Sequence, residues 1–429
     1  MFRVLVFPSC NEPGLEIINS LSKSNKVTLY GGSSYNLEFD PSRVILRNHI
    51  KCPDYYSEDF ADKFKRILEE NRIDIVFPTM DILVAEFSKW SLPGVTFITC
   101  NPETAELFLS KSRTYERLRN VVPVPRIYYD SSGDIELPVF AKPDVGSGSR
   151  SSRLICTKSQ LNLAREEGLL ITEFLPGEEF TVDCINDLHG RLLFYNVRIR
   201  GHVGRGISLG TSSKPDLRIE TYVRNIAKEV RIEGPWFAQF KVDRSGEPKL
   251  MEVNCRVAGS MTLTRLSGVN IPLLAVFLYM GFAVEVPRPI MNIRLNRCLR
   301  NFGEMDDFAW LIWDLDDTIL RKDGKPDPDV IACMYDCNNR GKKQILLKKN
   351  EKVEKLLEIH HIPHFFVEVC YTRDKVMELR RILSVYSLEA NECVMVNDSI
   401  MENLMLQKEF PNLRILRPDS LELLGKERV

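Results

Sequence analysis

The sequence predicts a multidomain protein of mixed α/β and α+β class: a parallel α/β domain, a middle domain rich in antiparallel strands, and a final parallel α/β domain. In roughly the first hundred residues, short β-branched runs alternate with amphipathic segments, which is typical of βαβ units. The middle carries paired strand patterns separated by turns rich in Gly, Asp and Ser. A new strand–helix alternation begins after residue 309.

The first domain is expected over residues 1–100. Its strands are expected at 3–7, 26–30, 73–78 and 94–99, and its helices at 14–23 and 60–72. This order predicts a parallel sheet covered by helices. No GxGxxG motif follows the first strand, so the residues give little support for a dinucleotide site.

The composition is that of an ordinary folded protein. The 429 residues suffice for two or three domains, and 44% hydrophobic with 27% charged residues excludes a collagen-like or wholly disordered chain. Because 58 Lys and Arg face 59 Asp and Glu, no strong global field draws the chain to nucleic acid or to an anionic membrane. Eleven scattered cysteines indicate reduced thiols and a cytoplasmic location. The longest apolar run, Ile271–Val284, is shorter than the ~18–20 residues that span a bilayer and is expected to be a core helix.

A lysine at the end of the expected strand 137–143 precedes a loop of glycines and serines. Lys142 is followed by Gly146, Ser147, Gly148 and Ser149. Glycines let backbone N–H groups approach a polyphosphate closely, and a lysine offers a compact positive charge. A flexible polar hairpin turn has the same composition, so the tract alone leaves both interpretations open.

A second polar cluster lies in a strand–turn–strand pattern further along the chain. If its strands pair across the turn 243–248, Gln239 comes opposite Glu252 and Asn254, which share one face. Oxygen donors with few full charges suit a magnesium ion that takes its other ligands from phosphates and water. Arg256 follows on the same face, where it can brace a transferring phosphoryl group. A solvated strand with outward polar residues is the alternative.

These motifs, in their order along the chain, resemble those of the ATP-grasp superfamily, most closely the ATP sites of carbamoyl phosphate synthetase large chains and D-alanine:D-alanine ligases. The resembling blocks are residues 77–81, 110–125, 139–150, 169–184 and 239–260. The resemblance implies an ATP-grasp fold over residues 101–300, preceded by a pre-ATP-grasp α/β domain at 1–100.

The resemblance also implies roles for single residues. Lys111 and Lys142 would touch the nucleotide phosphates beneath the glycine-serine loop. Adenine would be held by Glu173, Phe174 and Leu175, and the ribose hydroxyls would be bound by Glu179. The ligands of Mg²⁺, with Mn²⁺ as an alternative, would be Gln239, Glu252 and Asn254, and Arg256 would lie beside the transferred phosphoryl group. Gln239 departs from the Glu or Asp of many relatives, which weakens charge neutralisation for one metal. Such enzymes join a carboxylate to an amine through an acyl phosphate, and they need no protein nucleophile.

An arginine-rich tract follows the middle strands. Arg198, Arg200 and Arg205, with His202 and Lys214 nearby, are expected to form an anion pocket for the carboxylate or for a phosphorylated acceptor. A surface hairpin with solvated arginines is the alternative.

Residues 306–429 carry a different motif. Asp314 and Asp316 stand at the end of an apolar strand, where crowded carboxylates favour a local cation and where parallel sheets place active sites. The tail resembles the haloacid dehalogenase-like phosphohydrolases, which have a Rossmann-like fold. The resemblance implies that Asp314 is the nucleophile, Asp316 the general acid/base, Lys375 the group that steadies them, and Asp398 a magnesium ligand together with both aspartates.

Two departures bear on turnover in the tail. Lys348 stands where the resemblance expects a Thr or Ser that binds phosphate, and Asn397 stands where Asp or Gly is frequent. An active phosphatase and a phosphate-sensing or structural domain therefore both stay open. The histidines His360, His361 and His364 have no standard zinc spacing and are expected in a loop.

The sequence therefore predicts an ATP- and Mg²⁺-dependent ligase that joins a small carboxylate to an amine-type acceptor, either of which can carry a phosphate. Its fused phosphatase-like domain is expected to dephosphorylate the substrate or the product. A regulatory protein that binds nucleotide and phosphate without turnover, and a kinase that stops at phosphoryl transfer, are the rival interpretations. Neither nucleic acid nor membrane is an expected partner. The identity of the substrates is left open, and a homo-oligomer is allowed.

Overall fold

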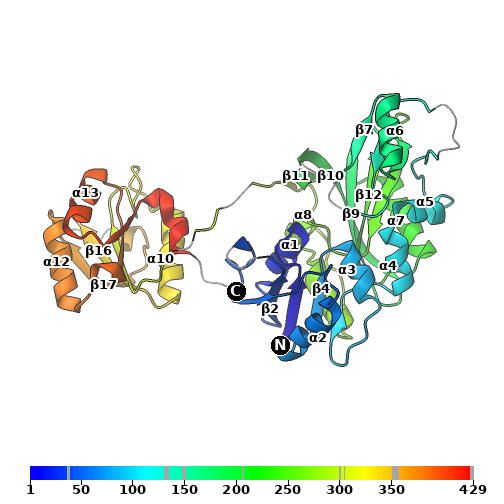
Figure 1. Cartoon of the computed structure of the whole chain (residues 1–429). Helices are drawn as coiled ribbons and strands as arrows, with labels where there is room; N and C mark the ends of the chain where they lie inside the picture. Colours follow the sequence, from blue (N-terminus) through cyan, green and yellow to red (C-terminus); the bar gives the residue numbers. More distant parts are fainter. Residues whose placement is uncertain are drawn as a thin grey trace. The chain divides into compact units, whose positions relative to one another are not determined.

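The computed structural model describes residues 1–35, 39–129, 135–146, 151–204, 207–298, 301–303, 305–349 and 357–425. It divides the chain into two compact units, Met1–Cys298 and Leu299–Val429, each with its own hydrophobic cores (Figure 1). The further division of the first unit near residue 100 stays a prediction.

The chain begins with a five-stranded parallel sheet. Its strands are β1 (Phe2–Phe7), β2 (Val27–Ser33), β3 (Asn48–Lys51), β4 (Ile75–Pro78) and β5 (Thr96–Phe97), in the order β3-β2-β1-β4-β5. The helices of this part are α1 (Glu12–Leu21), α2 (Phe60–Glu70) and α3 (Asp81–Phe87). The predicted parallel sheet is confirmed. Strand β3 was not predicted, because its four residues are at most half-buried and carry no apolar run.

A six-stranded sheet follows, with antiparallel neighbours in the order β13-β12-β9-β10-β11-β14. Its strands are β9 (Glu179–Asn186), β10 (Leu192–Gly204), β11 (Ile207–Ser213), β12 (Gly234–Val242), β13 (Pro248–Asn254) and β14 (Arg294–Asn296). Trp236, Ala238 and Phe240 alternate along β12 toward a core shared with α4 (Pro102–Leu109), α5 (Lys111–Leu118) and α7 (Leu217–Glu229). The residues between them, such as Gln239, therefore face the opposite side of the sheet.

A smaller three-stranded sheet, β7-β6-β8, carries two of the predicted nucleotide-binding segments at its strand ends. It consists of β6 (Val139–Lys142), β7 (Arg153–Ile155) and β8 (Leu170–Glu173), and α6 (Lys158–Glu166) packs on it. Helices α8 (Thr262–Leu266) and α9 (Ile271–Tyr279) complete the first unit. The predicted core helix is thus present as α9, which contributes to a core shared with the parallel sheet.

The second unit is a parallel α/β domain with the strand order β17-β16-β15-β18-β19. Its strands are β15 (Trp310–Asp314), β16 (Lys343–Lys348), β17 (Phe366–Tyr371), β18 (Cys393–Val396) and β19 (Arg414–Leu416). Helix α10 (Pro328–Asn339) covers one face, and α12 (Lys375–Tyr386) and α13 (Ile400–Glu409) cover the other (Figure 1). The predicted parallel architecture of the tail is confirmed at this level.

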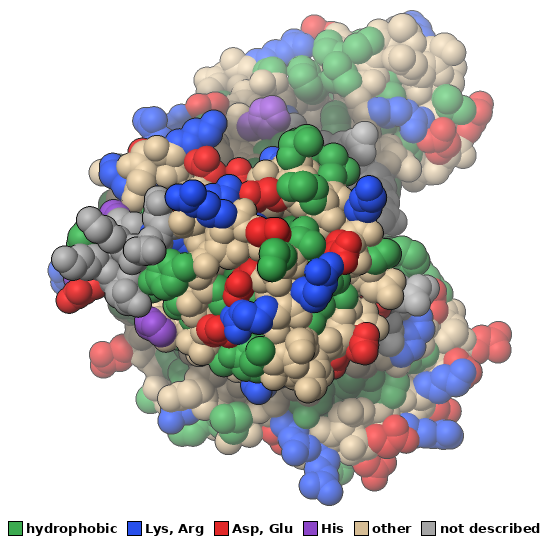
Figure 2. Space-filling model, turned by 90° about the vertical axis from the view of Figure 1, so that its left-hand side faces the viewer, with side chains coloured by type: hydrophobic (Ala, Val, Ile, Leu, Met, Phe, Trp, Pro, Cys, Tyr) green, Lys and Arg blue, Asp and Glu red, His purple; other side chains and the backbone are tan. Residues whose placement is uncertain are grey.

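Charges of both signs are interspersed over the face of the molecule shown in Figure 2, without a large region of one sign. Among the helices in the described ranges, none has the length and apolar character that crossing a membrane requires. All eleven cysteines are free thiols. His360 and His361 lie in the turn before β17, as predicted.

Candidate functional site

One row of polar residues crosses the six-stranded sheet on the side opposite Trp236 and Phe240. Gln239 on β12 lies opposite Glu252 on β13 and, on its other side, opposite Thr181 on β9. Thr181 in turn lies opposite Arg198 on β10. Residues directly opposite each other in a sheet point to the same face. The predicted pairing of Gln239 with the strand that carries Glu252 and Asn254 is therefore confirmed, because the hairpin closes at the predicted turn.

A second group of polar residues lies beside this row. Glu179 forms ion pairs with Arg200 and, at 3.7 Å, with Lys241. Arg200 Nη1 also donates to Gln239 Oε1 at 3.3 Å. Glu179 was predicted to bind ribose and Arg200 to bind the substrate anion. Because the two side chains form an ion pair, a ribose bound to Glu179 would share its carboxylate with Arg200.

Lys142 lies buried at the end of β6, against the six-stranded sheet. Its Nζ donates to Tyr115 Oη at 2.6 Å and to the carbonyl oxygen of Met251, the residue before Glu252, at 3.5 Å. Burial, with a smaller effect of Lys111, lowers the pKa of Lys142 to about 8. A group that carries negative charge would restore the ammonium form here, so the site is suited to phosphate.

The start of α5 is tied to the loop after β6. Lys111 Nζ donates to the carbonyl oxygen of Gly146 at 2.9 Å, and the Asp144 carboxylate accepts from Ser110 Oγ and from the backbone N–H of Ser112, both at 2.6 Å. Lys111 at the start of α5 and Lys142 at the end of β6, the two lysines predicted to bind phosphate, therefore lie on segments that these hydrogen bonds hold together. Ser147, Gly148 and Ser149, predicted in the covering loop, lie outside the described residues.

The segment predicted to hold adenine follows the end of β8. Glu173 accepts a hydrogen bond from the backbone N–H of Arg126 at 3.0 Å and forms an ion pair with Lys249 on β13. Leu175 is buried and Phe174 is half-buried. The ion pair fixes this segment to the same strand that carries Glu252.

The predicted magnesium residues offer one carboxylate and two amide oxygens. Glu252 is half-buried, and its carboxylate has neither a hydrogen bond nor an ion pair within the part of the chain that the structure describes. In the amide orientation that satisfies its neighbours, Asn254 Nδ2 donates to Asp81 Oδ1 at 3.1 Å, which leaves its oxygen for a ligand. No three His, Cys, Asp or Glu side chains of the described ranges converge on a metal position. These donors fit a magnesium ion only if phosphate oxygens and water complete its shell.

Arg256 is held in place by an acid that sequence reasoning missed. Its Nε and Nη2 donate to the Asp81 carboxylate at 2.6 and 3.1 Å, and its guanidinium lies 5.1 Å from the Phe237 ring centroid. Burial would lower the pKa of Arg256, but Asp81 and Glu252 raise it. The available signal was the position of Asp81 after β4, because the carboxyl ends of parallel strands gather functional side chains.

Arg198 is buried rather than solvated. It has 0% exposure, and its Nε and Nη2 bind the Asp183 carboxylate at 2.8 and 3.0 Å. The alternative of a surface hairpin with solvated arginines is therefore wrong for Arg198, although its predicted contact with a substrate anion stays a prediction. Arg205 lies outside the described residues.

The second unit gathers charged residues at the carboxyl ends of its strands. Lys375 Nζ lies 2.8 Å from Asp314 Oδ1, 2.8 Å from Asn397 Oδ1 and 2.6 Å from Glu402 Oε2. Burial raises the pKa of Asp314 to about 6, against the effect of Lys375. The sequence did not single out Glu402, whose only signal was its place on the helix after Asp398.

The carboxylates predicted to bind a metal in this unit have different surroundings. Asp314 faces Lys375, Asp316 is exposed, and Asp398 is half-buried. Within the described ranges they do not form a converging group of three acids. A magnesium ion here would depend on backbone oxygens, water and a phosphate for most of its ligands.

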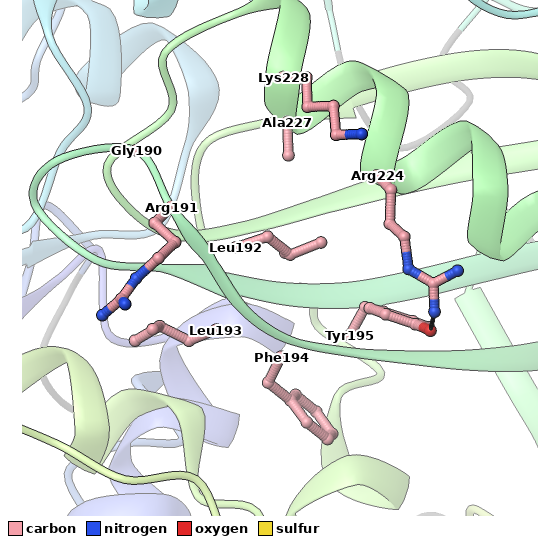
Figure 3. A pocket seen from close by; sticks show the side chains of 9 residues that line it. All are labelled: Gly190, Arg191, Leu192, Leu193, Phe194, Tyr195, Arg224, Ala227 and Lys228. Atoms are coloured by element: carbon pink, nitrogen blue, oxygen red, sulfur yellow. Dashed lines mark hydrogen bonds between the residues drawn. The ribbon is translucent and has the colours of Figure 1, made fainter.

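A separate cavity of about 370 Å³ lies between the β9–β10 turn and α7 (Figure 3). Arg224 donates to the Tyr195 hydroxyl there, and Leu192 and Ala227 supply apolar walls. None of the predicted site residues lines this cavity, so it is distinct from the polar rows of the sheet.

The first unit is similar to several known proteins. A family model described as "ATP-grasp in the biosynthetic pathway with Ter operon" matches residues 165–298. The solved biotin carboxylase domain of Hydrogenobacter thermophilus 2-oxoglutarate carboxylase, in complex with MgADP and bicarbonate, superposes with a TM-score of 0.55 at 18% identity, over 66% of this chain and 70% of that one. The first unit has the ATP-grasp fold. The L-amino acid ligase of Bacillus licheniformis is similar to this ATP-grasp unit with a TM-score of 0.51 at 17% identity, over 68% of this chain and 75% of that one.

The carbamoyl phosphate synthase large chain of Pyrococcus furiosus is 27% identical over 156 residues, which cover 32% of this chain. The chain matches only 14% of that relative's length. The matched ATP-grasp family model ends at residue 298, so the haloacid dehalogenase-like character of the tail stays a proposal.

Proposed function

We propose that this chain is an ATP- and Mg²⁺-dependent ligase that joins a small carboxylate to an amine or a related nucleophile through an acyl phosphate. The observation that carries the proposal is the contact of Lys142 with β13 beside Glu252, although the two residues are far apart in the sequence. A phosphate-binding lysine and a metal-binding carboxylate have to meet in this way around one triphosphate.

The residues of the site divide the work of phosphoryl transfer. Lys111 and Lys142 neutralise the phosphates, and the segment from Glu173 to Leu175 receives adenine. Glu252 and the amide oxygens of Gln239 and Asn254 would hold Mg²⁺, which would supply charge neutralisation on the phosphates. Arg256, fixed by Asp81, stabilises negative charge on the transferred phosphoryl group.

The similar proteins support small acids as substrates. The biotin carboxylase domain is described with bicarbonate and MgADP, and the Bacillus licheniformis protein is an L-amino acid ligase. A carboxylate attacks the terminal phosphate of ATP, which releases ADP and forms the acyl phosphate. The amine then displaces phosphate, and the reaction needs no serine or cysteine nucleophile.

The test is the release of ADP from ATP with a panel of small carboxylates and amines. ADP is expected when an acid and an amine are both present, with a fall of about 100-fold or more in Glu252→Gln. Glu116→Gln, at an exposed ion pair with Arg119, is the matched control and is expected to retain full activity. ADP formed without an acceptor would favour the kinase, and ATP binding without ADP release would favour the regulatory protein.

For the second unit we propose a phosphohydrolase-like site, which the 2.8 Å contact between Lys375 and Asp314 favours. Asp314 would accept the phosphoryl group, Asp316 would act as general acid/base, and Asp398 would bind magnesium. The unit would remove a phosphate from the substrate or product of the ligase. This coupling fails if Asp314→Asn leaves the final product of the full chain unchanged.

A further inference from the structure

The cavity of about 370 Å³ in the first unit takes no part in the proposed ligase site (Figure 3). One wall is strand β10, which supplies Leu192 and Tyr195, and the other is helix α7, which supplies Arg224, Ala227 and Lys228. The three helix residues are spaced i, i+3 and i+4 and therefore lie on one face of α7. The volume lies near the lower end of the ~300–1,000 Å³ range of small-molecule sites.

A β-bulge shapes the strand wall. Leu192 lies opposite Asn186 on β9, and Tyr195, three residues further along β10, lies opposite Cys184. These two partners are two residues apart on β9, so the bulge brings Leu192 and Tyr195 to the same face of β10. Ala227 lies across from them on α7, and its small side chain leaves the space between helix and strand open.

The rim of the cavity is basic. Of the nine lining residues, all of them in the described ranges, three are basic and none is acidic. Arg191 pairs with Asp187 at 3.1 Å, and Arg224 lies 3.7 Å from Glu220. Lys228 is exposed and has neither a hydrogen bond nor an ion pair with any residue that the structure describes. The rim therefore holds one basic group without an acidic partner, which suits a ligand with a single negative charge.

The polar atom of Tyr195 is already satisfied. Its hydroxyl donates to Glu220 at 2.9 Å and accepts from Arg224, whose guanidinium lies 5.0 Å from the ring centroid. The ring therefore meets a ligand as an apolar surface, as do Leu192 and Ala227. An apolar body and one negative charge are combined in a carboxylic acid. A phosphate monoester would bring up to two charges, more than the one unpaired cation of the rim balances.

We propose that this cavity binds a small carboxylic acid with an apolar body, whose carboxylate lies at Lys228 and whose apolar part packs against Tyr195 and Ala227. Tyr195 packs against the core that contains Phe240, so the site lies on the opposite side of the six-stranded sheet from Gln239. The acid is therefore expected to bind together with ATP. The proposal does not rest on the ligase activity of the first unit.

The test is calorimetric titration of the full chain with benzoate, phenylacetate and 2-naphthoate. At least one of these acids is expected to bind at one site per chain, with an affinity that saturating MgATP leaves unchanged. Lys228→Met is expected to weaken this binding at least about fivefold, because the carboxylate loses its cation. Lys23→Met, at an exposed lysine after α1, is the matched control and is expected to bind like the unchanged protein.

Two further comparisons test the apolar part of the site. Ala227→Phe places a ring in the cavity and is expected to weaken binding at least about tenfold. Thr221→Phe adds the same ring at an exposed position of α7 that does not line the cavity, and it is expected to have no effect. The uncharged alcohol that corresponds to the bound acid is expected to bind several-fold more weakly than the acid.

The proposal is overturned if none of the three acids binds, if either Lys228→Met or Ala227→Phe binds like the unchanged protein, or if either control weakens binding as much as its counterpart. Displacement of the acid by MgATP would also overturn it, because the acid would then occupy the nucleotide side of the sheet. If Ala227→Phe does not fold, Lys228→Met and the uncharged alcohol decide, and an unchanged affinity in either overturns the proposal.

Discussion

At the scale of single residues, Lys142 combines burial with a position beside the proposed metal site. A pKa of about 8 means that Lys142 is partly neutral in mildly alkaline solution when no anion lies beside it. ATP favours the charged form, so binding is expected to raise the pKa of Lys142 and to draw a proton from the solvent.

ATP binding at pH 8.5 is therefore expected to take up roughly half a proton or more. The measurement is calorimetry in buffers with different heats of ionisation. Lys142→Arg, which keeps its charge at this pH, is expected to bind ATP without the uptake. A binding heat that does not depend on the buffer would contradict this account of Lys142, as would equal uptake in the arginine variant.

The buried pair of Arg198 and Asp183 gives a second prediction at this scale. Asp183→Asn leaves the guanidinium buried without its counter-charge and is expected to lower the free energy of unfolding by about 3 kcal/mol. Asp187→Asn, four residues along at an ion pair whose arginine is 78% exposed, is expected to change it by less than about 0.5 kcal/mol. Urea unfolding measures both, and equal losses would show that burial of the pair does not matter.

The sequence predicted the site residues that stand in local motifs. It did not predict those whose role depends on contacts with residues far away in the chain. Lys142 and Glu252 stand in recognisable strand ends, and the hairpin turn set the register of Gln239. Asp81 acquires its role only from Arg256, which is 175 positions away. Arg198 was expected at an anion pocket, and its burial follows from Asp183 on the neighbouring strand, which no local pattern displays.

At the scale of elements, the connection between β8 and β9 controls how the adenine segment meets the sheet. A side chain at Gly177 would bring its Cβ within 2.7 Å of the Val242 Cβ and 2.8 Å of the Val242 carbonyl oxygen at the end of β12. The backbone at residue 177 therefore has to shift if this residue changes, and we expect Leu175, two residues away, to shift with it.

Gly177→Ala is expected to destabilise the first unit by about 1–3 kcal/mol and to weaken ATP binding. Gly201→Ala, whose Cβ would meet nothing closer than 3.7 Å, serves as the control within β10. Thermal unfolding and ATP titration give the two readouts. If Gly177→Ala binds ATP as tightly as the control, the close approach to Val242 does not position the adenine segment.

The elements also show which parts of the fold were predictable. Strands β1, β2, β4 and β5 and the β12–β13 hairpin have apolar runs or turn signals in the sequence, and the structure contains them. Strand β3 pairs only with β2 at the edge of its sheet and has no apolar run, so it depends on tertiary pairing.

At the scale of the whole molecule, the chain consists of two units with separate cores. The core clusters of the first unit contain residues up to Val286, and those of the second begin at Met305. The structure divides the chain at Cys298, close to the boundary predicted near residues 300–306. On the two sides of this boundary the apolar side chains pack into different cores.

A fragment that ends at Cys298 is expected to fold cooperatively and to bind ATP with the affinity of the full chain. Its unfolding transition should coincide with one transition of the full chain, because each core is complete within its unit. A fragment that is unfolded, or that binds ATP more than about tenfold more weakly, would show that the second unit completes the nucleotide site.

The central claim is that Lys142 and Glu252 act on one metal-bound triphosphate, and the most direct measurement is calorimetric titration of the full chain with ATP, with and without Mg²⁺. The account predicts saturable binding that strengthens with Mg²⁺, that loses at least tenfold in affinity in Lys142→Met, and that loses its dependence on Mg²⁺ in Glu252→Gln. Absence of ATP binding, or binding that neither substitution changes, would contradict it.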